Sequence, residues 1–463
     1  MGEMIPFNAN SLYAQLQNSL KAWEATSLPI DALKGLLTIK QITGDPQGSL
    51  RQFIVEQIDA LEKENKQHAD LLRLRFFEGA TIKEVAHERH LSRDQVNRQQ
   101  RRAIEHLAEL IYQKETALRQ ERLQDIQKRL PSRDYTQLFG NEKHKQLLAV
   151  TLLDPDKYHM VALVGMGGIG KTSLADITTR EIAPSFHFAD IFWLRFPQNN
   201  LSEPPSHYFV FNWVVSKLAS HFQLEEHSDY HQFLWVRQYL NQARYLIVID
   251  NLHNETQTPE LFKKLEEFAV PSKILLTARV RPAPQSTVFS IMMNEIDLKN
   301  ATDLLVHQLD AIGQRDKAAQ VKEHMPEIYA TTGGNPLALK LCAGLLYSLP
   351  LPIIIDEMEQ RHIRDIHDLY AYIYFELWKG LSENAQILLE AMPLADDIHG
   401  ASLEHIASVT KLPEKDVHHA IQELSQASLI EPRGSIEERR YSIHQLTRGF
   451  LLKEIIVWDK GPQ

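Results

Sequence analysis

The chain has 463 residues, a hydrophobic fraction of 43% and a formal net charge of −10 at pH 7. This length and composition predict two to four globular domains, each able to bury a core. The negative charge argues against attraction of the whole surface to nucleic acid, so any DNA contact must come from a local basic patch.

Cysteine content and apolar run length indicate the compartment. Cys342 is the single cysteine, which excludes an intramolecular disulfide and fits a reducing compartment. Residues 1–7 lack the basic start and apolar core of a signal peptide. The longest apolar runs, such as residues 349–355, are too short to span a bilayer. We therefore expect a cytoplasmic protein with no membrane contact.

Apolar residues at helical spacing begin near the N-terminus. Leu12, Leu16, Leu20 and Trp23 recur every three or four residues, and further leucines follow at positions 33, 36 and 37. This periodicity is typical of a buried helix face. We expect a small helical bundle that packs on the segment after it.

Two capping boxes follow, Thr81-x-x-Glu84 and Ser92-x-x-Gln95, and each marks the start of a helix. Only a few turn residues separate the two helices, which is the spacing of a helix-turn-helix. The expected core of this unit is apolar and comprises Val85, Ala86, Leu91, Val96 and Ile104.

The same segment, about residues 69–110, resembles the fourth region of bacterial sigma factors, in which a Gly-x-Thr helix is followed by a Ser-Arg recognition helix. Residues 92–102 contain four arginines and one aspartate. Arginine and amide side chains read base edges and contact phosphates. The candidate DNA-binding residues are therefore Arg93, Gln95, Arg98, Arg101 and Arg102. The alternative is a protein-docking module whose charged helix face is merely solvated.

An apolar run over residues 159–164 leads into a glycine-rich loop with the P-loop pattern G-x-x-x-x-G-K-[ST] and then into a helix. The expected phosphate-binding residues are Gly165, Gly167, Gly168, Gly170, Lys171, Thr172 and Ser173. Backbone N–H groups of the loop ring the phosphates at the positive end of the helix. We expect Lys171 to reach the β- and γ-phosphates and the Thr172 hydroxyl to bind Mg²⁺. The sequence therefore predicts binding of a nucleoside triphosphate.

Two later strands are expected to end near the P-loop. Residues 244–250 read as a buried parallel strand with Asp250 at its carboxyl end, where P-loop enzymes keep the aspartate that organises Mg²⁺. Residues 272–279 read as another strand, and Arg279 lies just beyond its apolar core. On position alone, Arg279 either senses a γ-phosphate or is a solvated strand-end arginine.

The residue after Asp250 bears on hydrolysis. Many P-loop ATPases have a second carboxylate there to polarise the attacking water, whereas this chain has Asn251. An amide orients water but cannot take its proton. We therefore expect a slow ATPase that keeps its nucleotide for a long time, with Glu255 as an alternative base.

The last part of the chain has the pattern of a winged helix. Residues 402–408 and 413–426 predict two helices, and residues 429–431 and 440–443 predict the strands of a β-wing. The second of these helices is close to neutral, so we assign this unit to contacts between domains rather than to DNA.

These motifs, in this order, resemble the NB-ARC branch of the STAND-class signalling ATPases, which includes plant resistance proteins and apoptotic activators. The likeness covers about residues 131–455. Besides the P-loop, Asp250 and Arg279, it rests on residues 134–142, residues 190–194 with Trp193, the motif Gly333-Gly334-Asn335-Pro336 and the run Tyr441-Ser442-Ile443-His444-Gln445.

The resemblance implies ATP or ADP with Mg²⁺ as the ligand and gives several residues a role. Residues 134–142, which include Phe139, would lie on the adenine side, and Pro336 would pack on the adenine. Arg279 would read the γ-phosphate, and His444 would contact the β-phosphate of ADP and so lock the resting form.

The chain departs from the family pattern at Asn141, Asn251 and Gln445, which stand where the family has an arginine, a second acid and an aspartate. The first departure removes one adenine-side contact, the second weakens hydrolysis, and the third loosens the closed state.

The expected fold class is multidomain α/β, with a P-loop NTPase parallel sheet, a helical subdomain and a winged-helix domain, preceded by an all-α domain. A highly polar helix over residues 113–129 leads to Pro131, where we place the first boundary. The expected domains are a helical domain with the helix-turn-helix, the nucleotide-binding domain, the small helical subdomain and the winged helix, at residues 1–130, 131–297, 298–368 and 369–463.

These features predict an ATP/ADP-gated signalling switch, most simply a transcriptional regulator whose helix-turn-helix binds duplex DNA. A second hypothesis is a signalling scaffold, like a prokaryotic NLR, that recruits a protein effector without touching DNA. A third is an ATPase that loads a DNA-bound partner, which Asn251 argues against. We expect self-association in the ATP state. Relatives continue into ligand-sensing repeats, and no repeat period appears here. Three explanations are open: an unknown protein partner senses the signal, the bound partner is itself the signal, or the sequence is truncated.

Overall fold

A computed structural model describes residues 9–25, 28, 33, 35–40, 46–133, 135–196, 206–224, 229–252, 259–279, 281–282, 287–354, 366–395, 400–433 and 438–455. Asp134 and Glu255, both considered as candidates from the sequence, lie outside these residues, as does the side chain of Gln445. The chain divides into two compact units, Met1–Asp125 and Ile126–Gln463. Among the described helices, none has the length and apolar character needed to cross a membrane.

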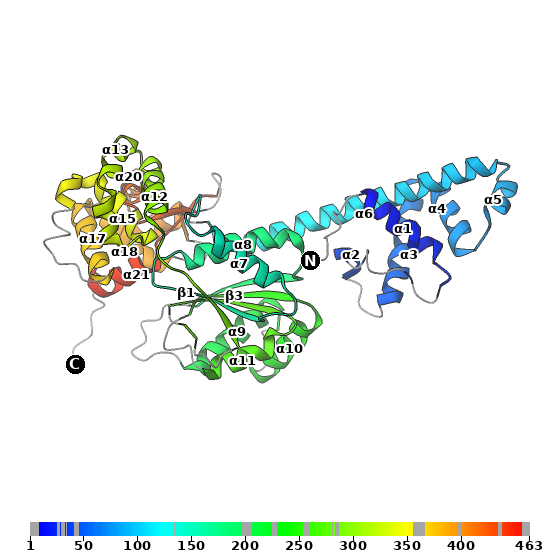
Figure 1. The fold of residues 1–463 in the computed structure, drawn as a ribbon, viewed down its shortest axis with the longest axis horizontal. Coiled ribbons are helices and arrows are strands. Elements are labelled where there is room, and N and C mark those ends of the chain that lie inside the picture. The colour runs from blue at the N-terminus through cyan, green and yellow to red at the C-terminus, as the bar shows by residue number, and fades with distance from the viewer. Residues whose placement is uncertain are drawn as a thin grey trace. The chain divides into compact units, whose positions relative to one another are not determined.

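The described elements of the first unit are all helices (Figure 1). Its elements are α1 (Ala9–Lys21), α2 (Leu37–Lys40), α3 (Pro46–Glu64), α4 (Lys66–Leu72), η1 (Arg73–Phe77), α5 (Ile82–Glu88) and most of α6 (Arg93–Arg129). Leu12, Leu16 and Leu20 of α1 are buried in one apolar core with Phe53 of α3 and Ile104 of α6. The bundle predicted from the leucine spacing is therefore confirmed.

Both capping boxes of the helix-turn-helix are formed. The Thr81 N–H donates to Glu84 Oε2 at 2.7 Å and the Glu84 N–H donates to Thr81 Oγ1 at 3.3 Å. Ser92 and Gln95 make the corresponding pair at 2.8 and 3.2 Å. Each box satisfies N–H groups that would otherwise be unpaired at a helix start, which fixes where α5 and α6 begin.

The turn between α5 and α6 is closed by a backbone hydrogen bond from the Leu91 N–H to the Ala86 carbonyl at 2.9 Å. Beneath it, Val85 and Val96 are buried with Leu71 of α4. The predicted core residues Val85, Ala86 and Val96 share this cluster, which Leu91 flanks, whereas Ile104 belongs to the larger core of the bundle.

The recognition helix predicted to start at Ser92 and the polar helix predicted over residues 113–129 are parts of one continuous helix, α6. No glycine or proline interrupts the sequence of α6, and a buried apolar stripe bridges the two predicted segments. This stripe comprises Ala103, Ile104, Leu107, Ala108 and Ile111. Because this stripe keeps helical spacing, the helix continues from the recognition segment into the polar segment.

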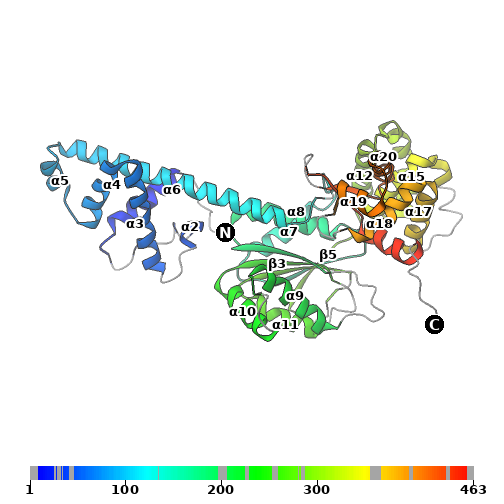
Figure 2. The ribbon, with the colours of Figure 1, turned by 180° about the vertical axis from the view of Figure 1, so that it is seen from behind.

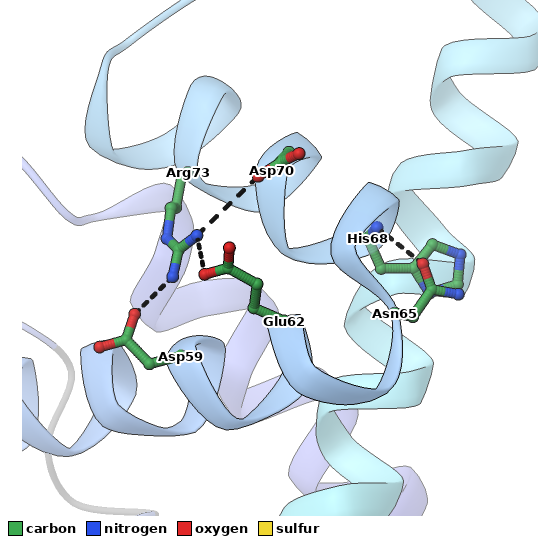
Figure 3. Close-up of polar contacts among 6 residues, drawn as sticks. All are labelled: Asp59, Glu62, Asn65, His68, Asp70 and Arg73. Carbon is green, nitrogen blue, oxygen red and sulfur yellow. Dashed lines mark hydrogen bonds and ion pairs between the residues drawn. The ribbon is translucent and has the colours of Figure 1, made fainter.

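Charged side chains tie the short helices of this unit together. The Arg73 guanidinium, at the end of α4, lies 2.5 Å from the Asp59 carboxylate and 2.6 Å from the Glu62 carboxylate of α3, with Asp70 at 3.9 Å (Figure 3). The fully buried Glu115 of α6 accepts hydrogen bonds from the backbone N–H groups of Leu37 and Thr38 at the start of α2.

The second unit contains a five-stranded parallel sheet of β1 (Met160–Val164), β2 (Asp190–Arg195), β3 (Tyr245–Leu252), β4 (Lys273–Ala278) and β5 (Val288–Met292). The strand order is β2-β3-β4-β1-β5. Helices α7 (Glu142–Leu153) and α8 (Lys171–Ile182) lie on one face, and α9 (His207–His221), α10 (Asp229–Gln242) and α11 (Pro259–Ala269) on the other (Figures 1 and 2). Burial on both faces explains why β1 is apolar throughout. A short 3-10 turn, η2 (Ala183–Ser185), follows α8.

Helices follow the sheet, as predicted. They are α12 (Leu298–Ala311), η4 (Arg315–Lys317), α13 (Ala318–Glu323), α14 (Met325–Thr332), α15 (Pro336–Ser348), α17 (Ile366–Gly380), α18 (Glu383–Ala391) and η5 (Met392–Leu394). The winged helix contains β6 (Ala401–Ser402), α19 (Leu403–Thr410), α20 (Glu414–Gln426), β7 (Glu431–Arg433), β8 (Arg440–Ser442), α21 (Gln445–Phe450) and η6 (Leu451–Ile455). Its antiparallel strands have the order β6-β8-β7, which confirms the predicted wing.

The last residue of α6 is bound to the first residue of β2. Arg129 donates from both terminal nitrogens to the Asp190 carboxylate, at 2.6 and 3.1 Å, and His221 Nε2 lies 3.4 Å from the same carboxylate. Asp190 is buried, so its charge depends on this bidentate pairing.

We predict that Arg129→Ala lowers the free energy of unfolding by about 2–3 kcal/mol, because it removes the bidentate partner of a buried carboxylate. Urea denaturation followed by intrinsic fluorescence measures the change. Lys143→Ala, at an exposed position of α7, is the matched control and should leave stability within about 0.5 kcal/mol of the unmodified protein. Equal stability of the two variants would contradict the assignment.

Candidate nucleotide-binding site

The sheet order brings the predicted motifs to one edge. Strand β4 lies between β1 and β3, and all three are parallel, so their carboxyl ends meet, as at ligand sites of other parallel sheets. The glycine-rich loop follows β1, Asp250 lies near the end of β3, and Arg279 follows β4. A cavity at this edge is lined by residues 167–173 of the loop, Asn251 and Arg279.

Two loop positions require glycine. Gly168 has φ +76°, and a Cβ there would lie 2.5 Å from the Tyr370 hydroxyl and 2.7 Å from Leu337 Cβ. Gly170 has φ +96° and is the N-cap of α8. A side chain at either position would strain the backbone, and at Gly168 it would also collide with the helices that cover the loop. Gly165 is not among the residues that line the cavity; its N–H donates to the Ala278 carbonyl at 3.3 Å.

Lys171 lies at the start of α8 and lines the cavity. Its Nζ donates to the carbonyl oxygens of Gly165 at 2.7 Å and Met166 at 2.8 Å. Burial, with a smaller contribution from the nearby Arg279 charge, lowers the pKa of Lys171 to about 8, and Asp250 opposes this shift. The ammonium group is therefore held at the phosphate loop in an environment that favours an added negative charge.

The Asp250 carboxylate is fully buried and joins four elements. Its Oδ1 accepts hydrogen bonds from the hydroxyls of Thr172 of α8 and Thr277 of β4, both at 2.7 Å. Its Oδ2 lies 3.3 Å from Arg195 Nε at the end of β2. Sequence reasoning missed Thr277 and Arg195, although a polar residue near the end of each apolar strand was the available signal.

The Thr172 and Asp250 pair fits the Mg²⁺ that the P-loop implies. A hydroxyl and a carboxylate in direct contact are hard oxygen donors of the type Mg²⁺ takes. Asp250 Oδ2 is buried and accepts no hydrogen bond from the described residues, and the cation beside it in this structure is the Arg195 guanidinium. When bound, Mg²⁺ would neutralise charge on the phosphates.

Asn251 follows Asp250 in a left-handed conformation, with φ +68°. The register between β3 and β4 shifts between Ile249 and Leu252, so the strand continues past its predicted end after an irregularity of the bulge type. The Asn251 N–H donates to Thr277 Oγ1 at 2.8 Å, and its side-chain amide donates to the Phe196 carbonyl at 3.3 Å. Asn251 thus lines the cavity with an amide and not with a carboxylate.

The start of α15 contacts the phosphate loop. Asn335 Nδ2 donates to the Gly167 carbonyl at 3.0 Å, and the Leu337 N–H donates to the Gly168 carbonyl at 3.3 Å. Asn335 Oδ1 caps α15 and also accepts from the Tyr370 hydroxyl at 2.8 Å. Sequence reasoning gave the role in this motif to Pro336, which lines the cavity, and missed that Asn335 joins the helix to the loop.

His444 is the N-cap of α21, and its Nδ1 accepts a hydrogen bond from the Leu446 N–H at 3.1 Å. Because Nδ1 accepts, the ring proton resides on Nε2, which is the nitrogen that can donate to an anion. His444 lines the same cavity as Phe139, Pro336 and the P-loop. The structure therefore brings these predicted residues together from segments far apart in the chain.

The candidate DNA-binding residues lie apart in sequence from the cavity-lining residues, on the first turns of α6. Arg93, Gln95, Arg98, Arg101 and Arg102 are all exposed. Part of this group is engaged within its own helix. Gln95 serves the capping box, Arg98 Nε donates to the Asp94 carbonyl at 3.3 Å, and Arg101 pairs with Glu105 at 2.9 Å.

Comparison with known families agrees with this architecture. Residues 141–305 match the NB-ARC domain, and residues 60–109 match Sigma-70, region 4. The P-loop and its sheet therefore match an NB-ARC domain, and the helix-turn-helix segment matches a sigma-factor region, as the sequence predicted.

Curated relatives include plant proteins. Disease susceptibility protein LOV1 of Arabidopsis thaliana is 27% identical over 240 residues, which cover 49% of this chain and 26% of the relative. Disease resistance protein RGA2 of Solanum bulbocastanum is 27% identical over 241 residues, covering 50% and 23%. Among solved structures, a STAND protein with a tetratricopeptide repeat sensor from Pyrococcus horikoshii is similar, with 18% identity and a TM-score of 0.44 over 70% of this chain and 43% of that chain. The chain spans about a quarter of the length of these plant relatives.

We predict that ADP affinity falls about tenfold between pH 7 and pH 9. The pKa of Lys171 is lowered to about 8, and a bound phosphate raises it, so above pH 8 the free protein must take up a proton to bind. Calorimetry in buffers of different ionisation enthalpy measures both the affinity and the proton uptake. Lys171→Arg, which keeps its charge over this range, is the control and should show a flat pH profile. An affinity of the unmodified protein that is constant from pH 7 to 9 would exclude this role for Lys171.

We also predict that Asn251→Asp accelerates ATP hydrolysis by about tenfold or more, because a carboxylate at this position can take the proton of the attacking water. Aspartate tolerates the left-handed backbone at this residue, so the fold should be retained. Phosphate release under single-turnover conditions measures the effect. Asn251→Gly, which adds no base and also tolerates this backbone, is the control and should remain slow; an Asn251→Asp variant that is no faster would point to another base.

Proposed function

We propose that this chain is a signalling switch in which ADP stabilises the closed arrangement of the nucleotide, helical and winged-helix segments, and ATP favours an arrangement that lets the N-terminal helix-turn-helix bind DNA. The observation that carries this proposal is the shared cavity: His444 of the winged helix, Pro336 of α15 and the P-loop all line it. A ligand in this cavity would contact all three segments at once.

The contacts around the P-loop support a switch that senses nucleotide state. Lys171 and His444 would bind phosphate oxygens, and Thr172 and Asp250 would hold Mg²⁺. Leu446, two residues after His444, lies so close to Gly167 that a Cβ there would approach it to 3.3 Å. A ligand shifts a conformational equilibrium only through different contacts in the two states. In the closed arrangement the winged helix lies against the P-loop, so the added γ-phosphate of ATP would make different contacts there from those in an open arrangement.

Exposed arginines at the start of α6 support DNA as the target. The first turns of a recognition helix are the part that enters the major groove, and Arg93, Arg98 and Arg102 are exposed there. The chain as a whole carries a net charge of −10. Contact with a duplex therefore depends on this basic segment, and binding would weaken steeply with salt.

The test is fluorescence anisotropy of a labelled mixed-sequence duplex, titrated with the full chain over a series of salt concentrations, first with ADP and then with a non-hydrolysable ATP analogue. We expect tighter binding with the ATP analogue. In the triple variant R98A/R101A/R102A, the negative slope of log affinity against log salt should become shallower by about 2–3. Lys143→Ala, at an exposed position of the second unit, should not change the slope.

Absence of DNA binding with either nucleotide would overturn the transcriptional output. Sedimentation of the same samples then distinguishes the alternatives. Nucleotide-dependent self-association without DNA binding would support a scaffold that recruits a protein effector, whereas fast, sustained ATP turnover would support a hydrolysing ATPase.

A further inference from the structure

Arg195 lines the nucleotide cavity, but it belongs to none of the sequence motifs from which the nucleotide site was predicted. It is the last residue of β2 and is paired in register with Asp250 on the neighbouring strand β3. The side chains of Arg195 and Asp250 are 10% and 0% exposed, and Arg195 Nε lies 3.3 Å from Asp250 Oδ2. The strand pairing therefore holds a guanidinium group beside the carboxylate that would organise Mg²⁺.

The two oxygens of Asp250 have different partners. Oδ1 accepts from the hydroxyls of Thr172 and Thr277, which are neutral donors and leave the negative charge in place. Oδ2 is paired with a charged group, the Arg195 guanidinium, which is the ion-pair partner of this carboxylate among the described residues. A buried carboxylate without a cation is strongly unfavourable, so Arg195 already supplies the charge compensation that a metal ion would otherwise provide.

The charges of the residues that line the cavity also support a masked Asp250. Its described lining includes Lys171, Arg195, Arg279 and Lys340 but no aspartate or glutamate. Asp250 lies behind this lining, bound to Arg195 and the two threonines. The surface that a diphosphate would meet is therefore positive before any metal binds, because the nearby carboxylate is masked.

We propose that Arg195 sets the metal requirement of this site: it neutralises Asp250 so that ADP binds without Mg²⁺, and Mg²⁺ can use Asp250 only when Arg195 moves away. The inference rests on the nucleotide site of the proposed function and names a regulatory feature of it. Arg195 is a positioning residue, because it acts through Asp250. The ADP-bound state is then indifferent to Mg²⁺, whereas a metal-bound state has to break the Arg195 to Asp250 pair.

The test compares the affinity of a fluorescent ADP analogue for the full chain in Mg²⁺ and in EDTA. For the unmodified protein the two affinities should agree within about threefold. In Arg195→Gln the unmasked Asp250 charge opposes the diphosphate unless Mg²⁺ is present, so the affinity in EDTA should be about tenfold or more weaker than in Mg²⁺, the size expected for one charge interaction. In Arg195→Lys, the affinities in Mg²⁺ and in EDTA should again agree as closely as in the unmodified protein.

Further variants separate this mechanism from a loss of structure. The double variant Arg195→Gln with Asp250→Asn removes both charges and should again bind ADP equally in Mg²⁺ and EDTA. Arg244→Gln, at an exposed position before β3, is the matched control, and thermal unfolding reports whether each variant is folded.

The outcomes distinguish the two proposals. If the unmodified protein binds no ADP in either condition, the nucleotide switch itself fails. If it binds ADP only with Mg²⁺, or if Arg195→Gln keeps the ratio of the unmodified protein, the role of Arg195 is overturned and the nucleotide site stands.

Discussion

The nucleotide site depends on one buried charge. Asp250 has no exposed surface, so its carboxylate must be compensated inside the protein. It receives hydroxyls from α8 and β4 and the guanidinium of Arg195 from β2. Because these partners come from three elements and Asp250 itself lies in β3, satisfying one carboxylate positions the P-loop helix relative to three strands of the sheet. The geometry that would hold Mg²⁺ and phosphate is a consequence of this requirement.

The helices that cover the P-loop are joined to it through polar backbone groups. Asn335 and the Leu337 N–H bind carbonyl oxygens of the loop, and Gly168 has no side chain because Tyr370 and Leu337 occupy the space. Contacts of this kind are directional, so a change in the loop alters the partners of α15 directly. The winged helix adds His444 to the same cavity, which gives a single ligand access to segments that fold as separate motifs.

Local signals in the sequence predicted local structure well. The capping boxes at Thr81 and Ser92 mark the observed helix starts, and the glycine-rich loop lies between β1 and α8, as its sequence pattern predicted. The recognition helix and the polar helix, predicted as separate features, are one helix, α6, because a buried apolar stripe continues between them. Strand β5 was not predicted. It lies at the edge of the sheet and only Ile291 of its residues is buried, so it lacks the continuous apolar run that marks a central strand.

The sequence by itself determined the chemistry of the nucleotide site: glycines where backbone must approach phosphate, Lys171 and Thr172 at a helix start, and an amide at Asn251 in place of a second acid. It could do so because these groups are close in the chain or follow an apolar strand. Only the tertiary structure decided which charges are paired, since the contact between Arg195 and Asp250 depends on strand order and register. Pairing across a sheet leaves no periodic trace in either strand, so the residue beside the key carboxylate becomes visible only in the folded chain.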